Sequence, residues 1–108
     1  MKGRLPIKAL SVNKLYRGRR FKSNEYKDYS QRVLYLLPAG SIDSEEIELV
    51  ITVGLSSPLA DLSNVVKAFE DLLQEKYGFN DRYVKEIHLY KEKVKKGEEF
   101  IAFEIITK

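Results

Sequence analysis

The spacing of apolar residues along the chain predicts four strands and two helices. Strict alternation of apolar and polar residues, typical of a strand with one buried face, is clearest over residues 46–55. Shorter segments with strand character are residues 4–10, 84–92 and 99–107. Lys95-Lys96-Gly97-Glu98 is expected to form the hairpin turn between the last two strands.

Two other segments repeat with the period of a helix. The first, residues 24–37, follows a capping residue at Ser23 or Asn24, and the second, residues 62–76, ends before Gly78, a natural C-cap. The residues expected to face the core are Tyr26, Tyr29, Val33 and Leu36 in the first helix and Val65, Phe69, Leu72 and Leu73 in the second.

The resulting order, β-α-β-α-β-β, predicts an α+β fold in which two helices pack against a small mixed sheet. A chain of 108 residues is long enough for one hydrophobic core but short for two. We therefore expect residues 1–108 to form a single domain.

Composition narrows the chemistry that this domain can perform. The chain has no cysteine, which excludes disulfides, thiolate zinc sites and a cysteine nucleophile, and its single histidine makes a His-based zinc site or a Ser-His-Asp triad a poor candidate. A bound metal would then be a hard cation held by carboxylates. We expect no small-molecule cofactor.

A membrane location is not expected either. The longest apolar stretch, residues 33–39, is far shorter than the roughly 18 residues that a transmembrane helix needs. Lys8 interrupts the apolar region that a signal peptide would require. These features predict a cytoplasmic protein.

Basic and acidic residues are unevenly distributed along the chain, with a basic N-terminal third and an acidic remainder. Residues 1–35 hold ten basic and two acidic residues, a net charge of +8, whereas residues 36–108 hold nine basic and fourteen acidic residues, a net charge of −5. The densest basic stretch, residues 14–22, also contains two aromatic residues. Such a pattern suits contact with a nucleic-acid backbone, because cations neutralise phosphates and aromatic rings stack on exposed bases. The alternative is a solvated loop that its aromatic residues anchor to the core.

A group of polar residues lies at the predicted start of the second helix. Asp61 immediately precedes this helix and Lys67 lies about one and a half turns inside it. A carboxylate beside a helix N-terminus is well placed to hold a divalent cation against a phosphate. On local evidence alone, however, a capping role for Asp61 or Ser63 and a solvated position for Lys67 are the favoured interpretations.

Two further residues belong to the C-terminal half. Asp81, in the loop before the third strand, suits either a second metal ligand or a turn residue. His88 alternates with Ile87 and Leu89, so it should lie on the other face of its strand, together with Glu86 and Tyr90. We expect a sheet-face histidine there rather than a catalytic one.

Three segments together resemble the RusA-type Holliday-junction resolvases, a family of small phage and prophage endonucleases. Ser11-Val-Asn13-Lys14-Leu-Tyr16 resembles the family's N-terminal Ser/Pro-x-Asn-x-x-Tyr/Trp segment, which precedes a basic loop and a helix. Asp61-Leu-Ser63-Asn64-Val-Val-Lys67 resembles the motif Asp-x-Asp-Asn-x-x-Lys. Gly78-Phe79-Asn80-Asp81 resembles the Asp-Asp segment before the final strands. The resemblance extends over about residues 7–106.

This resemblance implies a homodimer that binds four-way DNA junctions in recombination and repair and cuts them with Mg²⁺ or Mn²⁺. Asp61 and Asp81 would hold the metal and Lys67 would assist catalysis. The residues expected at the DNA are Asn13, Lys14, Tyr16, Arg17, Arg19, Arg20, Lys22 and Asn64.

The sequence departs from the family pattern at two acids, which are replaced by Ser63 and Asn80. The change at Ser63 removes an expected metal ligand, because a hydroxyl is a poorer ligand than a carboxylate. Glu70 does not replace it: nine residues of helix place Glu70 more than about 13 Å from Asp61 along the axis, too far to share an ion. Asp71 is excluded in the same way.

The sequence therefore supports two main hypotheses. The first is a metal-dependent junction endonuclease, and the second is a junction-binding protein on the same scaffold whose catalysis is weakened or lost through Ser63. A more distant third is an RNA-binding α+β domain that uses the basic segment and its tyrosines.

Overall fold

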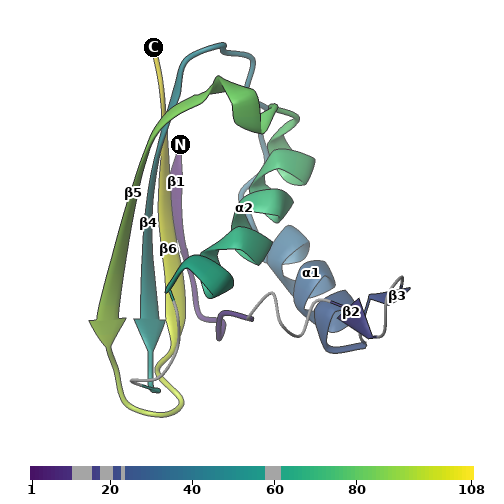
Figure 1. Cartoon of the computed structure of the whole chain (residues 1–108), viewed down its shortest axis with the longest axis vertical. Coiled ribbons are helices and arrows are strands. Elements are labelled where there is room, and N and C mark those ends of the chain that lie inside the picture. The colour runs from purple at the N-terminus through teal and green to yellow at the C-terminus, as the bar shows by residue number, and fades with distance from the viewer. Residues whose placement is uncertain (11–15, 18–20, 23, 58–61) are drawn as a thin grey trace.

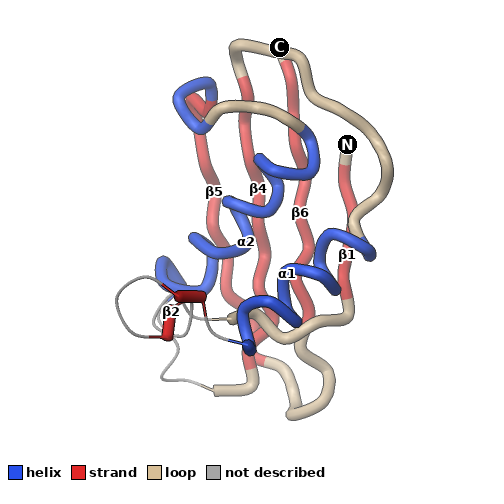
Figure 2. Tube along the Cα trace, turned by 90° about the vertical axis from the view of Figure 1, so that its right-hand side faces the viewer, coloured by secondary structure: helices blue, strands red, loops and turns tan. Residues whose placement is uncertain are grey.

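A four-stranded mixed sheet carries both helices on one of its faces (Figures 1 and 2). This computed structural model describes residues 1–10, 16–17, 21–22, 24–57 and 62–108, with the backbone alone at residues 16, 17, 21, 22, 63 and 64. The strands of the sheet are β1 (Lys2–Leu5), β4 (Ile47–Leu55), β5 (Val84–Lys93) and β6 (Phe100–Thr107), in the order β1-β6-β4-β5. The helices are α1 (Asn24–Leu36) and α2 (Leu62–Tyr77). The predicted α+β class and element order are confirmed.

The alternating sequence of β4 explains its central position. Its residues Ile47, Leu49, Ile51 and Val53 are almost completely buried beneath the helices, as their spacing predicted. The strand pairs in parallel with β5 and antiparallel with β6. A parallel pair needs a crossover connection, and here α2 supplies it.

The two helices bury the predicted apolar stripes against this face. Val65, Phe69, Leu72 and Leu73 of α2 are at most 5% exposed. In α1, Tyr26, Tyr29 and Val33 are buried, but the predicted core residue Leu36 is only half-buried. Leu37 takes that place in the core, since it lies one turn after Val33 and donates its N–H to the Val33 carbonyl at 2.9 Å.

The first strand is shorter and earlier than the sequence predicted. It pairs with β6 from Lys2 opposite Glu104 to Leu5 opposite Ile101, and Pro6 follows its last residue. Proline has no N–H for the ladder, and the Ile7 N–H then turns back to the Leu5 carbonyl at 2.9 Å. The predicted strand over residues 4–10 is therefore wrong beyond Leu5.

The predicted basic loop contains a small hairpin. Its strands are β2 (Tyr16–Arg17) and β3 (Phe21–Lys22), with Tyr16 opposite Lys22 and Arg17 opposite Phe21. The hairpin lies on the helix side of the sheet, next to the N-terminal end of α1 (Figure 1). At the other end of the molecule, Gly78 terminates α2 with φ +76° and donates its N–H to the Gln74 carbonyl, which confirms the predicted C-cap.

Candidate functional site

Lys67 lies on an exposed part of α2 and pairs with an acid on its own helix. Its Nζ atom is 3.1 Å from an Asp71 carboxylate oxygen, and the two side chains are 53% and 42% exposed. A pair of this kind, four residues apart on a helix, contributes only about 0.3–0.5 kcal/mol. The ammonium of Lys67 can therefore leave Asp71 for another anion at little energetic cost.

Asp81 begins one turn of 3-10 helix, Asp81–Tyr83, directly after α2. The turn is capped by Asn80, whose side-chain oxygen accepts the Arg82 N–H at 3.0 Å. Among the described residues, the exposed carboxylate of Asp81 accepts no hydrogen bond and forms no ion pair. Asp81 therefore lies in a turn, as the sequence allowed, but the side chain that caps the turn is that of Asn80, and the Asp81 carboxylate is left accessible.

Asp81 and Lys67 belong to one electrostatic group, which also contains Glu70 and Asp71. The hydrogen bond from Lys67 to Asp71 raises the pKa of Lys67, and the charges of Asp71, Glu70 and Asp81 raise it further. Partial burial raises the pKa of Glu70; Lys67 opposes that shift, and the charges of Asp71 and Asp81 add to it. With one cation among three acids, this group favours an additional positive charge.

The acids of this group are not close enough to one another to surround a single ion. Within the described ranges, the only three acidic or histidine side chains whose ligand atoms lie within 4.8 Å of one another belong to a different cluster. The fit of Mg²⁺ near Lys67 therefore depends on Asp81 with waters and a substrate phosphate, which is the usual environment of Mg²⁺ in proteins.

Several predicted site residues lie outside the described part of the chain. These residues are Asn13, Lys14, Arg19, Arg20 and Asp61. The backbone places Ser63 and Asn64 in the first turn of α2, and Tyr16, Arg17 and Lys22 in the small hairpin. The predicted pairing of Asp61 with Asp81 stays a prediction, because Asp61 lies outside the described residues.

The hairpin supports a prediction about DNA contact. The affinity K falls as salt concentration rises, so the slope of log K against log salt concentration is negative. We expect that replacing Arg17, Arg19 and Arg20 by alanine lowers the magnitude of this slope by about two to three units, because each phosphate contact releases counterions. The measurement is fluorescence anisotropy with a labelled four-way junction at several salt concentrations. A matched control removes Lys93, Lys95 and Lys96 near the β5–β6 turn and should leave the slope unchanged. Equal slopes for the arginine variant and the wild type would contradict the contact.

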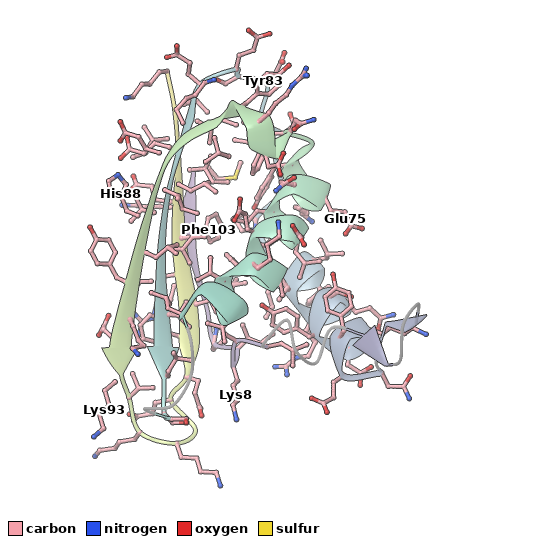
Figure 3. All side chains as sticks on the ribbon, in the orientation of Figure 1. Lys8, Glu75, Tyr83, His88, Lys93 and Phe103 are labelled. Carbon is pink, nitrogen blue, oxygen red and sulfur yellow. The ribbon has the colours of Figure 1, made fainter. Side chains whose placement is uncertain are left out.

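The cluster with metal-ligand spacing is formed by Glu48, Glu86 and His88. The His88 Nε2 atom lies 3.1 Å from a Glu48 carboxylate oxygen and 3.4 Å from a Glu86 oxygen. The cluster lies on the face of the sheet opposite to the helices, and Figure 3 shows His88 pointing away from them. A protonated imidazole would form ion pairs with both carboxylates.

This cluster shows what the sequence analysis missed. The alternation of β5 correctly predicted that His88 shares a face with Glu86. It did not show that β5 pairs in parallel with β4, with Glu48 opposite Glu86 and Val50 opposite His88. That register depends on the α2 crossover, which no local pattern specifies.

The sequence matches no protein-family model and no curated protein. The resemblance to RusA-type resolvases is carried by the three quoted segments alone. Within the described residues, neither helix has the length and apolar character needed to cross a membrane.

Proposed function

We propose that this chain is a metal-dependent endodeoxyribonuclease that binds four-way DNA junctions and cuts them, as a homodimer, in recombination and repair. The observation that carries the proposal is the position of Lys67 on an exposed part of α2, with the exposed Asp81 in the 3-10 turn that follows that helix. The charge of Asp81 makes the smallest of the contributions to the pKa of Lys67. These two residues are 14 positions apart in the sequence, and the resemblance assigns both of them to one site. The three acids near Lys67 add a negative potential that attracts a divalent cation.

Asp81, together with Asp61, would hold Mg²⁺ or Mn²⁺ in this proposal, and Ser63 offers at most a hydroxyl. A bound divalent ion polarises the scissile phosphate and lowers the pKa of an attacking water. Lys67 is protonated at neutral pH, as an ordinary lysine is, and its weak pair with Asp71 lets the ammonium turn to a phosphate oxygen. The lysine thus stabilises the negative charge that develops during cleavage.

The basic hairpin and its flanking residues would follow the DNA backbone. Cationic side chains in this segment contact phosphates and carry no base-specific information. The preference for a junction then comes from the shape of the DNA and from the paired sites of a dimer.

A second candidate function is a junction-binding protein that does not cut DNA. The observation in its favour is Ser63, where the resembling motif has an acid. The basic segment would serve both functions equally, so the binding of DNA does not distinguish them. An RNA-binding role would instead predict equal or greater affinity for a hairpin RNA than for a DNA junction.

The nuclease proposal is tested by removing the two linked side chains one at a time. We expect Lys67→Ala and Asp81→Asn each to lower the rate of junction cleavage by about 100-fold or more, the usual loss when a group that stabilises the transition state is removed. The measurement is single-turnover cleavage of a labelled junction in Mg²⁺ and in Mn²⁺, with affinity measured separately in Ca²⁺.

The controls are Asp71→Asn, which removes the partner of Lys67, and Glu86→Gln, on the opposite face of the sheet. Both variants should cut the junction at rates within a few-fold of the wild type. Unchanged rates for Lys67→Ala and Asp81→Asn would overturn the assignment of the site. A loss caused only by Glu86→Gln would instead assign the metal to the cluster of Glu48, Glu86 and His88. Tight binding without cleavage by the wild type would favour the second function.

A further inference from the structure

The cluster formed by Glu48, Glu86 and His88, here called the Glu-His cluster, joins two neighbouring strands of the sheet. Glu48 lies on β4, and the other two residues lie on β5. All three side chains lie on the face opposite to the helices, where Figure 3 shows His88 pointing away from α2. The side chain of Glu48 is 21% exposed, whereas those of His88 and Glu86 are 42% and 54% exposed. The cluster is therefore partly buried at Glu48 and accessible to solvent at its other two members.

An irregularity in the pairing of β4 with β5 brings these side chains together. Ile47 pairs with Val84. The next residue of β4, Glu48, pairs with Glu86 and not with Lys85, so Lys85 is an extra residue in β5, as in a β-bulge. Uninterrupted pairing would place Glu48 opposite Lys85, a residue of opposite charge. The bulge places it opposite a second carboxylate instead, and bulges commonly redirect side chains next to functional sites.

This register places like charges next to each other. Carboxylates directly opposite on neighbouring strands repel and destabilise a sheet. A third acid on the same face, the exposed Glu104 of β6, is paired with Val50, which is also the partner of His88. The basic residue Lys2 lies beyond Glu104 on β1, three strands away from β5. A cation between the two opposed carboxylates removes their repulsion: a proton on His88 supplies one positive charge, and a divalent metal ion supplies two.

The separations of the ligand atoms match those around a bound zinc ion. Histidine nitrogen and carboxylate oxygen bind Zn²⁺ at about 2.0–2.2 Å, so two such atoms in a tetrahedral site lie roughly 3.3–3.6 Å apart. The His88 Nε2 atom lies 3.1 Å from a Glu48 oxygen and 3.4 Å from a Glu86 oxygen, and all three ligand atoms lie within 4.8 Å of one another. Small side-chain rotations are therefore enough to form three of the four tetrahedral positions.

The types of ligand atom in the Glu-His cluster select the metal. An imidazole nitrogen suits Zn²⁺ and its neighbours in the transition series, whereas Mg²⁺ prefers oxygen ligands and keeps several waters. The affinity of a mixed nitrogen and oxygen site is also greater for Zn²⁺ than for Mn²⁺. The Glu-His cluster therefore differs in its metal preference from a site that consists of Asp81, a phosphate and water.

A small hollow beside the Glu-His cluster leaves room for a fourth ligand. Its volume is about 40 Å³, and its lining includes Glu46, Glu48, Glu86, Lys85 and Lys108. Roughly 10–15 Å³ is enough to hold one water molecule. The carboxylates in this lining outnumber the ammonium groups, so the hollow favours a hydrated cation.

We propose that Glu48, Glu86 and His88 bind one Zn²⁺ ion per chain, with a water molecule as the fourth ligand. The ion ties the first half of β5, an edge strand of the sheet, to β4. This site lies on the opposite side of the sheet from Lys67 and takes no part in the proposed cleavage of DNA. The inference is therefore independent of the proposed function, and its test contains no DNA.

The test is direct because the chain has a single histidine, so every imidazole signal comes from His88. The full chain, without a histidine tag and freed of metal by a chelator, is titrated with Zn²⁺ at about pH 7.5, where an ordinary histidine is neutral. Long-range proton–nitrogen NMR spectra report on both ring nitrogens, and calorimetry gives the stoichiometry and the affinity. We expect one equivalent of Zn²⁺ to shift the Nε2 signal and the same concentration of Mg²⁺ to leave it unchanged.

Three variants remove one ligand each: Glu48→Gln, Glu86→Gln and His88→Gln. We expect each variant to lower the affinity for Zn²⁺ at least about tenfold, since even the loss of a group that only supports a ligand costs about 10- to 100-fold. The matched control is Glu92→Gln, which changes an exposed acid on the same face of β5 outside the Glu-His cluster and should bind Zn²⁺ like the wild type. Circular dichroism confirms that each variant is folded.

Three results would overturn the inference. An imidazole signal that does not shift while Zn²⁺ binds would place the ion elsewhere, such as among the acids around Lys67. Equal affinities of the wild type and His88→Gln would show that the imidazole is not a ligand. An affinity for Zn²⁺ no greater than that for Mg²⁺ would leave the Glu-His cluster as a histidine that only forms ion pairs with its two carboxylates.

Discussion

Replacing Ser63 by aspartate is expected to raise the rate of junction cleavage about tenfold to 100-fold. The reason is the missing ligand: a carboxylate at this position would hold Mg²⁺ more tightly than a hydroxyl, and ligand-shell changes of this kind alter activity by about 10- to 100-fold. The backbone places position 63 in the first turn of α2, where the helix dipole also favours a negative charge. The measurement is the single-turnover rate in Mg²⁺ and in Mn²⁺ for both proteins.

The matched control is Ser63→Asn, which has nearly the size and shape of the aspartate variant without its charge. It should cleave at the rate of the wild type. A gain in both variants would assign the effect to size or helix capping rather than to the metal. No product from any of the three proteins, despite tight binding, would favour a protein that only binds junctions.

The second large effect concerns Gly54, which lies on the face of β4 opposite to the helices. A Cβ atom at this position would clash with the ring of Phe100, the residue opposite it on β6. Phe100 is 3% exposed, and the guanidinium carbon of Arg4 lies 3.7 Å from its ring centroid, so the ring has little freedom to move. We expect Gly54→Val to lower the free energy of unfolding by about 2–3 kcal/mol, the usual cost of overpacking.

Urea denaturation with circular dichroism measures this loss. The control, Thr52→Val, changes a half-buried residue on the same face of the same strand and should have an effect near zero. In the double variant Gly54→Val with Phe100→Ala, the valine occupies space left by the ring, so the double variant should be more stable than the sum of the two single losses implies. Strict additivity would show that the contact with Phe100 is not the cause.

Most helices and strands of this protein could be predicted because each carries a local periodic pattern. The alternation in β4 and the apolar stripe of α2 follow directly from side-chain direction in strands and helices. The end of β1 was predicted wrongly because residues 4–10 continue to look like a strand after Pro6. What ends β1 there is the loss of pairing with β6, and that pairing joins residues about 100 positions apart.

The candidate site was harder to predict from the sequence than the helices and strands. The lysine and the later acid could be chosen from their motifs, and the spacing also correctly suggested that His88 and Glu86 share a face. The cluster of Glu48 with these two residues depends on the register between β4 and β5, and the proximity of Glu70 to Asp81 depends on how the chain returns after α2. Both are tertiary relations, which no single segment encodes.

The pairing of β1 with β6 has a consequence for assembly. Lys2 and Arg4 belong to β1, a strand of four residues that pairs with β6, near the opposite end of the sequence. Closing so long a loop is entropically costly and depends on the rest of the core. Until the two ends of the chain have met, the edge of β6 that β1 later covers therefore stays open, and an open strand edge can pair with a strand of another molecule.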